Sequence, residues 1–354
     1  MTGGAGRPKA LSAHLPDRRS RPVPFGGISG ESAETRHMPQ SFARVTCKAY
    51  GKVNLGLSVL GRRQDGYHEV STVMTAVNLF DLLTVELAPF KEGRVLSVCC
   101  PALPDLPEEQ NLVFRAAREY LSRNPVRTGV RVRVDKGIPP GGGMGGGSSD
   151  AAATLLAVGN ALRTAGALPP GEEACDLRDM ARRLGADVPF FLGPNSVPPQ
   201  YTAALCTGIG DIVTPMEANP FWLVILLLKE GVSTPWAFSV WDLDNPEGGR
   251  AFSSERDDRP LAVAGELRNG TAESLAQVLY NDLEEPIIAR RKDIAGAKEA
   301  LLRAGALSAV MTGSGSTVYG ICGSQEHALD VRERIRGFKM GYLHDVLVVR
   351  TGVI

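Results

Sequence analysis

The glycine-rich segment at 141–147, with six glycines among seven residues, places the strongest constraint on how this chain folds. An alternating apolar pattern at 129–135 predicts a strand before it, and the apolar spacing at 151–158 predicts a helix after it. Strand, glycine loop and helix form an arrangement that binds phosphate, because amides without a nearby Cβ approach an anion closely and a helix N-terminus attracts negative charge. We therefore predict a phosphate-binding loop, in preference to the flexible linker that such tracts usually form.

Two familiar nucleotide-binding patterns fit this loop less well. A Walker A loop requires a lysine directly after its last glycine, where this chain has Ser148. The dinucleotide pattern G-x-G-x-x-G is present at Gly141, Gly143 and Gly146. However, segment 167–173 does not provide the second strand with an acidic end that a dinucleotide site needs. The loop therefore predicts phosphate binding of another type.

Charge and composition exclude several classes of protein. The chain has 354 residues with 39 basic and 39 acidic side chains, so no general positive field is available to hold nucleic acid or an acidic membrane. Its six cysteines form no C-x-x-C pair and indicate neither a disulfide framework nor a zinc site. The apolar run at 221–228 is much shorter than the roughly 20 residues of a membrane-spanning helix and predicts a buried strand.

The order of the predicted elements indicates an α+β fold in two lobes, because strands and helices follow one another without a strict βαβ rhythm. The glycine- and proline-rich segment 185–199 marks a boundary, and we expect domains at 41–195 and 196–354. A polar surface loop is expected at 242–260. Residues 1–40 lack hydrophobic periodicity and are expected to be a disordered extension, although their excess of basic residues also fits an organelle transit peptide.

Polar residues in two other segments are candidates for chemistry. Lys52 and Asn54 lie two positions apart in an alternating strand pattern, so their side chains project from the same face. Asp187 lies in the turn GADVP at 185–189, where a carboxylate before a proline is often only a helix cap. On spacing alone, a solvent-facing strand and a capping residue are the simpler interpretations.

Five short motifs are more informative together than separately. In chain order they are GKVNLGL at 51–57, RQDGYH at 63–68, PPGGGMGGGSS at 139–149, GADVP at 185–189 and TGSGS at 312–316. The second and the last would separately be an exposed turn and a hairpin. Their types and order resemble the small-molecule kinase superfamily of galactokinase, homoserine kinase, mevalonate kinase and phosphomevalonate kinase, over about residues 43–350. The chain departs from the usual pattern at Gly51, Met144, Asp150 and Ser316.

The resemblance implies a two-lobed small-molecule kinase fold. The N-terminal lobe would resemble the ribosomal protein S5 domain 2-like fold, and the C-terminal lobe would be a ferredoxin-like α/β sandwich. ATP is the implied phosphoryl donor, with Mg²⁺ bound mainly through the nucleotide phosphates and no metal site built by the protein. The expected partner is a small-molecule substrate, without nucleic acid or membrane, and the protein would be a monomer or a weak homodimer. The implied location is the bacterial cytoplasm, or the plastid stroma if residues 1–40 are a transit peptide.

The resemblance also assigns roles to individual residues. Asp187 matches the catalytic carboxylate that takes or orients the proton of the attacking hydroxyl, and Lys52 matches the lysine that pairs with it. Asn54 matches a ligand of the substrate hydroxyls. The residues implied to hold a cytosine ring are Tyr67, His68 and Phe238. The residues implied to bind ATP are Asn111 at the adenine pocket and, in the loop, Pro139, Pro140, Gly141, Gly142, Gly143, Met144, Gly145, Gly146, Gly147, Ser148 and Ser149.

The implied activity is ATP-dependent phosphorylation of the 2-hydroxyl of 4-diphosphocytidyl-2-C-methyl-D-erythritol, giving the 2-phosphate and ADP in the non-mevalonate route to isoprenoids and terpenoids. One alternative is a kinase of the same superfamily that acts on a different small alcohol. Another is a binding protein, because the N-terminal half resembles modules of RNA-associated proteins. The zero net charge and the presence of both Lys52 and Asp187 argue against that second alternative.

Overall fold

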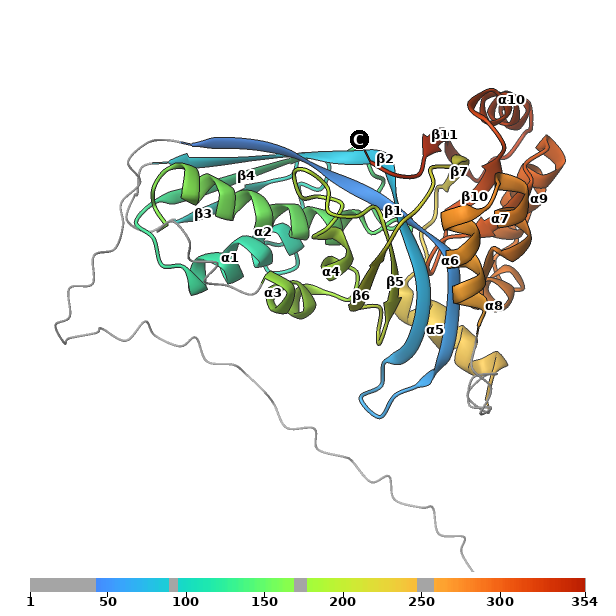
Figure 1. Cartoon of the computed structure of the whole chain (residues 1–354), viewed down its shortest axis with the longest axis horizontal. Helices are drawn as coiled ribbons and strands as arrows, with labels where there is room; N and C mark the ends of the chain where they lie inside the picture. Colours follow the sequence, from blue (N-terminus) through green and yellow to red (C-terminus); the bar gives the residue numbers. More distant parts are fainter. Residues whose placement is uncertain (1–42, 89–94, 169–176, 247–257, 354) are drawn as a thin grey trace, which may run out of the picture. The chain divides into compact units, whose positions relative to one another are not determined.

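Two β-sheets organise the described residues, which are 43–88, 95–168, 177–246 and 258–353 of the computed structural model (Figure 1). Helices pack against both sheets, so the α+β class predicted from the sequence is confirmed. The extension expected at 1–40 lies outside the described residues. Within the described ranges, no helix is both long enough and apolar enough to cross a membrane.

The first sheet is built around a long antiparallel pair, β1 (Arg44–Arg62) and β2 (His68–Ala88). Its other strands are β3 (Leu96–Cys99), β4 (Gly129–Asp135), β5 (Ala203–Thr207), β6 (Ile212–Met216) and β8 (Tyr280–Asn281). The path runs β3-β4-β2-β1-β8, and β5 joins β2 and carries β6. Strands β5 and β6 follow residue 195, so this sheet continues beyond the boundary expected between the domains.

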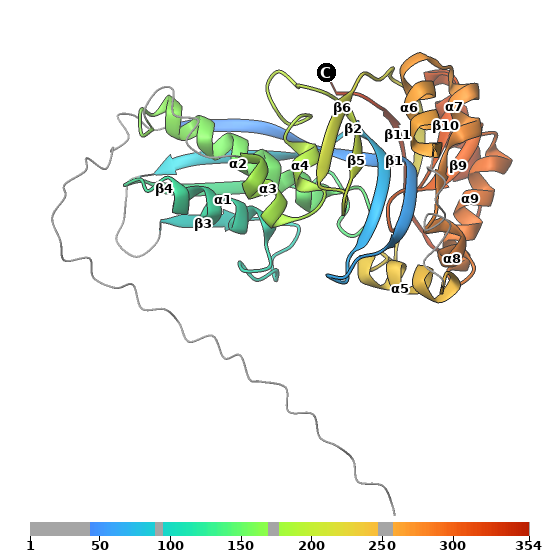
Figure 2. The ribbon, with the colours of Figure 1, turned by 60° about the horizontal axis from the view of Figure 1, so that its bottom comes forward.

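Helices from the N-terminal half gather on one face of the first sheet, as Figure 2 shows. They are α1 (Leu112–Arg123), α2 (Gly146–Thr164), α3 (Leu177–Leu184) and α4 (Val188–Phe191). Strand β4 packs Val130, Val132 and Val134 against this helical layer, while Arg131 and Arg133 face away. The alternation of apolar and basic residues that predicted this strand therefore arises because successive side chains point to opposite faces of the sheet. The glycine loop and α2 therefore follow the end of β4, whose position is fixed by the sheet.

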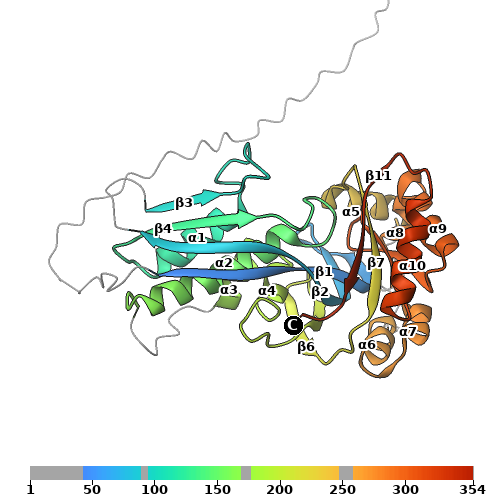
Figure 3. The ribbon, with the colours of Figure 1, turned by 90° about the horizontal axis from the view of Figure 1, so that it is seen from above.

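The second sheet has the order β11-β7-β10-β9. Its strands are β7 (Trp222–Leu228), β9 (Ser308–Met311), β10 (Val318–Cys322) and β11 (Leu343–Arg350). The helices of this half are α5 (Thr234–Asp244), α6 (Arg259–Asn269), α7 (Ala272–Val278), α8 (Glu284–Ile288), α9 (Lys292–Ala304) and α10 (Gln325–Arg336). Figure 3 shows α9 and α10 on the outer side of this sheet.

Strand β7 has an uninterrupted apolar sequence because both of its faces are buried. Leu223, Ile225 and Leu227 point into a cluster with Val53 and Leu55 of β1. The alternate residues Val224 and Leu226 point into a second cluster, which includes side chains of α9 and α10. The predicted buried strand at 221–228 is confirmed, and it forms the wall between the two clusters.

The polar loop predicted at 242–260 is wrong at both ends. Helix α5 continues to Asp244, because Val240 and Trp241 on its last turns are buried against the core. Helix α6 begins at Arg259, with Pro260 in its first turn, where a proline costs no intrahelical hydrogen bond. Residues 247–257 between them lie outside the described part of the chain.

Candidate active site

A cavity of about 540 Å³ lies where the two sheets meet, and it brings together most of the residues selected from the sequence. The glycine loop, β1, α5 and the turn after β9 all contribute to its walls. Of the selected residues, those that line it are Lys52, Asn54, Asn111, Pro139, Pro140, Gly141, Gly142, Gly143, Met144, Gly145, Gly146, Gly147, Ser148, Asp187 and Phe238. Ser149, Tyr67 and His68 are not among the lining residues.

The glycine loop has the backbone conformation that its sequence requires. Gly141, Gly143 and Gly145 have φ angles of 76°, 76° and 71°, a region that residues with a Cβ rarely adopt. Helix α2 starts immediately afterwards, and its N-cap residue Gly145 offers no side chain to the helix. The first-turn amides of a helix have no intrahelical partner, so the N-terminal end of α2 directs unused donors and the positive end of its dipole toward the cavity. Ser148 adds a hydroxyl at the same wall.

The loop is anchored to both halves of the fold. Met144 is buried in the cluster between the two sheets, and its carbonyl oxygen accepts a hydrogen bond of 3.0 Å from the backbone amide of Lys52. On the other side, a Cβ at Gly143 would lie 2.7 Å from the carbonyl oxygen of Thr312. Glycine is required here for close approach of two backbones as well as for the positive φ angle. Strand β1 and the 312–316 turn thus fix the position of the loop from opposite sides.

Lys52 and Asp187 meet across the cavity. The Lys52 ammonium lies 3.6 Å from a carboxylate oxygen of Asp187 and donates a hydrogen bond of 2.6 Å to the side-chain oxygen of Asn54. Lys52 is 3% exposed, whereas the Asp187 side chain is 30% exposed. A buried ammonium with two oxygen partners and a more accessible carboxylate is suited to holding a hydroxyl substrate next to a phosphate.

The structure distinguishes between the two interpretations of Asp187. The residue occupies the N-cap position of the short helix α4, but its side chain makes no capping hydrogen bond. Its carboxylate faces Lys52 instead. The simpler interpretation of Lys52 and Asn54 also fails, because both side chains are buried. These residues therefore face one another in the cavity and are available for chemistry.

Asn54 also connects β1 to the second sheet. Its side-chain amide donates a 2.8 Å hydrogen bond to the hydroxyl of Thr72, and its backbone amide donates one of 2.9 Å to the hydroxyl of Thr312. The backbone carbonyl oxygen of Asn54 accepts a hydrogen bond of 2.9 Å from the Tyr319 hydroxyl. The orientation of Asn54 is therefore set by contacts with distant parts of the chain.

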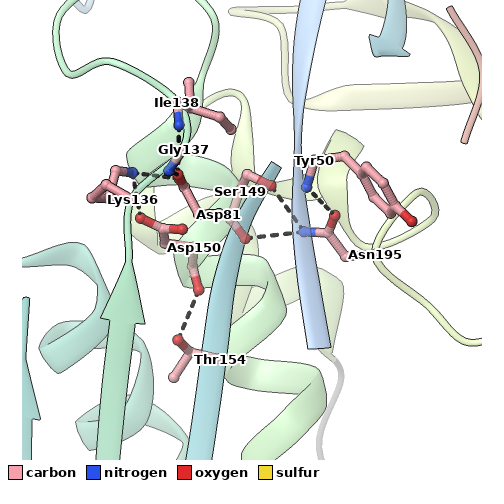
Figure 4. Close-up of polar contacts among 9 residues, drawn as sticks. All are labelled: Tyr50, Asp81, Lys136, Gly137, Ile138, Ser149, Asp150, Thr154 and Asn195. Carbon is pink, nitrogen blue, oxygen red and sulfur yellow. Dashed lines mark hydrogen bonds and ion pairs between the residues drawn. The ribbon is translucent and has the colours of Figure 1, made fainter. Parts of the chain in front are cut away.

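A buried charge cluster beneath the loop was not selected from the sequence (Figure 4). The Lys136 ammonium contacts Asp81 at 2.5 Å and Asp150 at 2.8 Å. The other oxygen of Asp81 accepts hydrogen bonds of 2.6 and 2.7 Å from the amides of Gly137 and Ile138. The cluster thus joins β2, the residues that lead into the glycine loop, and α2.

Desolvation raises the pKa of Asp150 to about 7, and the neighbouring charge of Asp81 adds to the rise while Lys136 opposes it. One oxygen of Asp150 is buried without a hydrogen-bond partner. A charged group in such a position is costly to keep ionised. The sequence signals for this cluster were the departure at Asp150 and an acid, Asp81, with apolar residues on both sides.

Ser149 is held differently from its neighbour Ser148. It is fully buried, and its hydroxyl and carbonyl oxygens each accept a hydrogen bond of 3.0 Å from the side-chain amide of Asn195 (Figure 4). The side-chain oxygen of Asn195 accepts one of 3.0 Å from the amide of Tyr50. Of the two serines implied to reach phosphate, only Ser148 therefore faces the cavity, because Asn195 uses the Ser149 hydroxyl to hold the first turn of α2.

The residues implied to hold a base are only partly assembled. The rings of His68 and Phe238 are stacked, with centroids 4.5 Å apart and an interplanar angle of 19°. Tyr67 lies in the hairpin between β1 and β2 and is 61% exposed. Asn111 caps α1 by accepting a 2.9 Å hydrogen bond from the amide of Val113, and it borders the cavity. The structure therefore brings His68 to Phe238 and leaves Tyr67 accessible.

Known protein families match both halves of the chain. The family described as "GHMP kinases N terminal domain" matches residues 111–193, and the family described as "GHMP kinases C terminal" matches residues 263–339. A homoserine kinase structure from Cytophaga hutchinsonii has a TM-score of 0.62 at 18% identity, covering 92% of this chain and 98% of its own. This likeness shows a shared fold, and the two-lobed kinase fold expected from the resemblance is confirmed.

Relatives with higher sequence identity show which family of GHMP kinases the chain belongs to. A 4-diphosphocytidyl-2-C-methyl-D-erythritol kinase of Symbiobacterium thermophilum is 37% identical over 305 residues, 86% of this chain and 98% of that protein. One from Mycolicibacterium smegmatis is 37% identical over 297 residues, 83% of this chain and 86% of that protein. A crystal structure of 4-(cytidine 5'-diphospho)-2C-methyl-D-erythritol kinase has a TM-score of 0.68 at 31% identity, covering 87% of this chain and 100% of its own. The chain therefore belongs to the 4-diphosphocytidyl-2-C-methyl-D-erythritol kinase family of GHMP kinases.

Proposed function

We propose that this protein transfers the γ-phosphoryl group of ATP to the 2-hydroxyl of 4-diphosphocytidyl-2-C-methyl-D-erythritol. The observation that carries the proposal is the Lys52–Asp187 pair, which lies in the same cavity as the glycine loop and the N-terminus of α2. A phosphate cradle beside a lysine–carboxylate pair is the arrangement that a kinase for an alcohol needs. The names of the relatives supply the substrate.

The phosphate end of the reaction relies on backbone groups. Amides of the glycine loop and of the first turn of α2 would hold the phosphate oxygens, with Ser148 adding its hydroxyl. A Cβ at Gly142 would lie 2.8 Å from the hydroxyl of Thr317, which leaves little room for a larger residue in this cradle. Asn111 borders the same cavity and would face the adenine end of the nucleotide. Backbone donors allow a neutral chain to bind a highly charged nucleotide.

The acceptor end relies on the buried pair. Asp187 would accept or orient the proton of the 2-hydroxyl, and Lys52 would hold the hydroxyl oxygen in line with the γ-phosphate. Asn54 would bind a neighbouring hydroxyl of the substrate. Phosphoryl transfer passes through a loose transition state, so positioning and charge stabilisation contribute more than early proton removal.

Magnesium would be held mainly through the nucleotide phosphates. Among the described residues, no group of three or more His, Cys, Asp or Glu side chains is arranged to hold a metal ion, whereas the cavity has donors for phosphate. When bound, Mg²⁺ would neutralise charge on the phosphates. The protein's own contribution is to fix the phosphates and the acceptor hydroxyl relative to one another.

Three aromatic side chains near the cavity support a substrate that carries a cytidyl group. Tyr67 is an exposed ring on the hairpin, and His68 and Phe238 form a stacked pair close to the cavity. Aromatic rings of this kind bind a base by stacking, and the imidazole offers hydrogen bonds to its edge. We propose that the cytosine binds among these three side chains.

An ATP-consumption assay with purified protein tests the proposed function. The cytidyl substrate is compared with homoserine and mevalonate, and phosphorus NMR locates the new phosphate on the 2-oxygen. We expect turnover with the cytidyl substrate at least about 100-fold above either competitor, since a site built to bind a polar group strongly rejects ligands that lack it. Turnover with homoserine or mevalonate alone would overturn the proposal.

A further inference from the structure

The ring of His68 is fixed from several directions by one helix. Its Nε2 atom lies 2.7 Å from a carboxylate oxygen of Asp242. Phe238, one turn earlier on α5, stacks on the ring, and Trp241 meets it edge-on with centroids 5.8 Å apart. The His68 side chain is only 7% exposed. These contacts leave the imidazole little freedom to rotate or flip.

The contact with Asp242 determines which ring nitrogen carries hydrogen. A carboxylate accepts hydrogen bonds and donates none, so Nε2 of His68 must be the N–H donor in this pair. In the neutral ring, the other nitrogen, Nδ1, is then an acceptor. The second oxygen of Asp242 lies 3.8 Å from the guanidinium of Arg62, so each oxygen of the carboxylate has a partner.

The acceptor nitrogen is available to a ligand. Nδ1 of His68 has no hydrogen-bond partner among the described residues. It is also absent from the buried side-chain atoms that lack a partner, which within the described residues are one oxygen of Asp150 and the hydroxyl of Thr317. Nδ1 therefore keeps some exposed surface, although most of the ring is enclosed and His68 itself is not among the residues that line the cavity. Its stacking partner Phe238 lines the cavity.

We propose that Asp242 is a positioning residue that makes the base subsite specific for a pyrimidine with an exocyclic amine. With Nε2–H held by Asp242, Nδ1 of His68 accepts a hydrogen bond from the 4-amino group of cytosine. The 4-oxo group of uracil is itself an acceptor, so it meets the same lone pair with repulsion. This inference rests on the proposed function, and it adds the residue that discriminates between the two pyrimidines.

The test compares the cytidyl substrate with its uridyl analogue, using the full chain. Asp242→Asn keeps the size of the side chain, but its amide can also donate, so it no longer imposes one tautomer on His68. We expect the KM for the cytidyl substrate to rise about tenfold, with kcat within about threefold and the KM for ATP unchanged. The preference for cytidyl over uridyl substrate should fall about tenfold or more.

Asp244→Asn is the matched control. Asp244 lies on the same helix and is paired with an arginine, Arg290, through hydrogen bonds of 2.7 and 2.8 Å. This variant removes the same charge two residues away, and we expect it to keep the preference of the wild type. Equal loss of preference in both variants, or an unchanged preference in Asp242→Asn, would overturn the proposal.

Nitrogen-15 NMR of the wild-type imidazoles gives a readout that does not depend on the Asp242→Asn variant. The His68 signal, assigned by its absence in His68→Gln, should show the Nε2–H tautomer, and cytidine diphosphate should shift it more than uridine diphosphate does. An Nδ1–H tautomer in the wild type would refute the role of Asp242. If the wild type fails to phosphorylate the cytidyl substrate, the proposed function fails, and the tautomer and the two nucleotide titrations still decide the inference about the base.

Discussion

Gly143 of the phosphate loop packs so closely on Thr312 of the opposite turn that a Cβ at position 143 would lie 2.7 Å from the Thr312 carbonyl oxygen. The same Cβ would lie 2.9 Å from the carbonyl oxygen of Gly315. Both obstacles are backbone atoms, which cannot rotate away as a side chain can. The contact joins the loop that follows β4 to the turn between β9 and β10, so the geometry of the phosphate cradle depends on the second sheet.

Gly143→Ala is expected to destabilise the protein and to raise the KM for ATP. Gly141→Ala is its matched control, because Gly141 has the same φ of 76° but open space around its Cβ. The free energy of unfolding should be about 1–3 kcal/mol lower for Gly143→Ala than for Gly141→Ala, since only the former adds backbone overlap to the φ strain. Denaturant unfolding measures the difference. Equal destabilisation would mean that φ strain alone accounts for the effect.

Asp187→Asn is expected to lower kcat by about two to four orders of magnitude, because it removes the carboxylate that we propose takes or orients the hydroxyl proton. The dissociation constant for ATP should change by less than about threefold, because the glycine loop remains intact. Steady-state kinetics and nucleotide titration measure the two effects. Asp211→Asn is the control, since Asp211 is a nearby acid outside the cavity lining. A parallel loss of ATP affinity in Asp187→Asn would indicate a structural role.

Tyr67→Ala is expected to weaken binding of the cytidyl substrate without weakening the fold. The side chain is 61% exposed, so its removal should leave the melting temperature within about 2 °C of the wild type. Loss of one stacking ring should raise the KM for the cytidyl substrate about tenfold or more. Tyr67→Phe keeps the ring and should retain the wild-type KM. A lowered melting temperature with an unchanged KM would contradict a role in binding the base.

Asp150→Asn tests the buried charge cluster through its pH dependence. Burial raises the pKa of Asp150 to about 7, so the folded state binds more protons than the unfolded state between about pH 4 and pH 7. The stability contributed by protonated Asp150 is therefore present at low pH and lost as the pH rises through 7. The variant should gain about 1–3 kcal/mol of unfolding free energy relative to the wild type between pH 5 and pH 8.

Urea unfolding of both proteins at the two pH values provides this comparison. Any constant cost of replacing the carboxylate next to Lys136 cancels, because only the change between pH 5 and pH 8 is used. Parallel stability curves for wild type and Asp150→Asn would show that the carboxylate does not titrate in this range in the folded state.

Much of the fold follows from local patterns. The two-residue alternation at 129–135 and the apolar run at 221–228 correspond to β4 and β7, because one strand has one buried face and the other has two. The glycine loop was also predictable, because its position between a patterned strand and a patterned helix argues against a flexible linker. Lys52 and Asp187 were selected, and the structure places their charged groups 3.6 Å apart.

The remaining parts of the site depend on contacts between distant segments. His68 and Asp242 are 174 positions apart, and only the packing of α5 against the start of β2 brings them together. The pair Asp81–Lys136 likewise has no characteristic spacing, because the three-dimensional course of the sheet, and not a local motif, sets the distance. Sequence patterns report elements and loops, whereas such pairs become visible only when the sheets are assembled.

The double-sided burial of β7 limits how the protein can move. Swinging the second sheet away from β1 would expose Leu223, Ile225 and Leu227 together, and each apolar side chain of this size costs about 1.5–3 kcal/mol to expose. Opening the cavity by such a movement would therefore be costly, and we expect its width to change little when substrates bind. The length and shape of a substrate would then limit its entry into the cavity as well as its binding there.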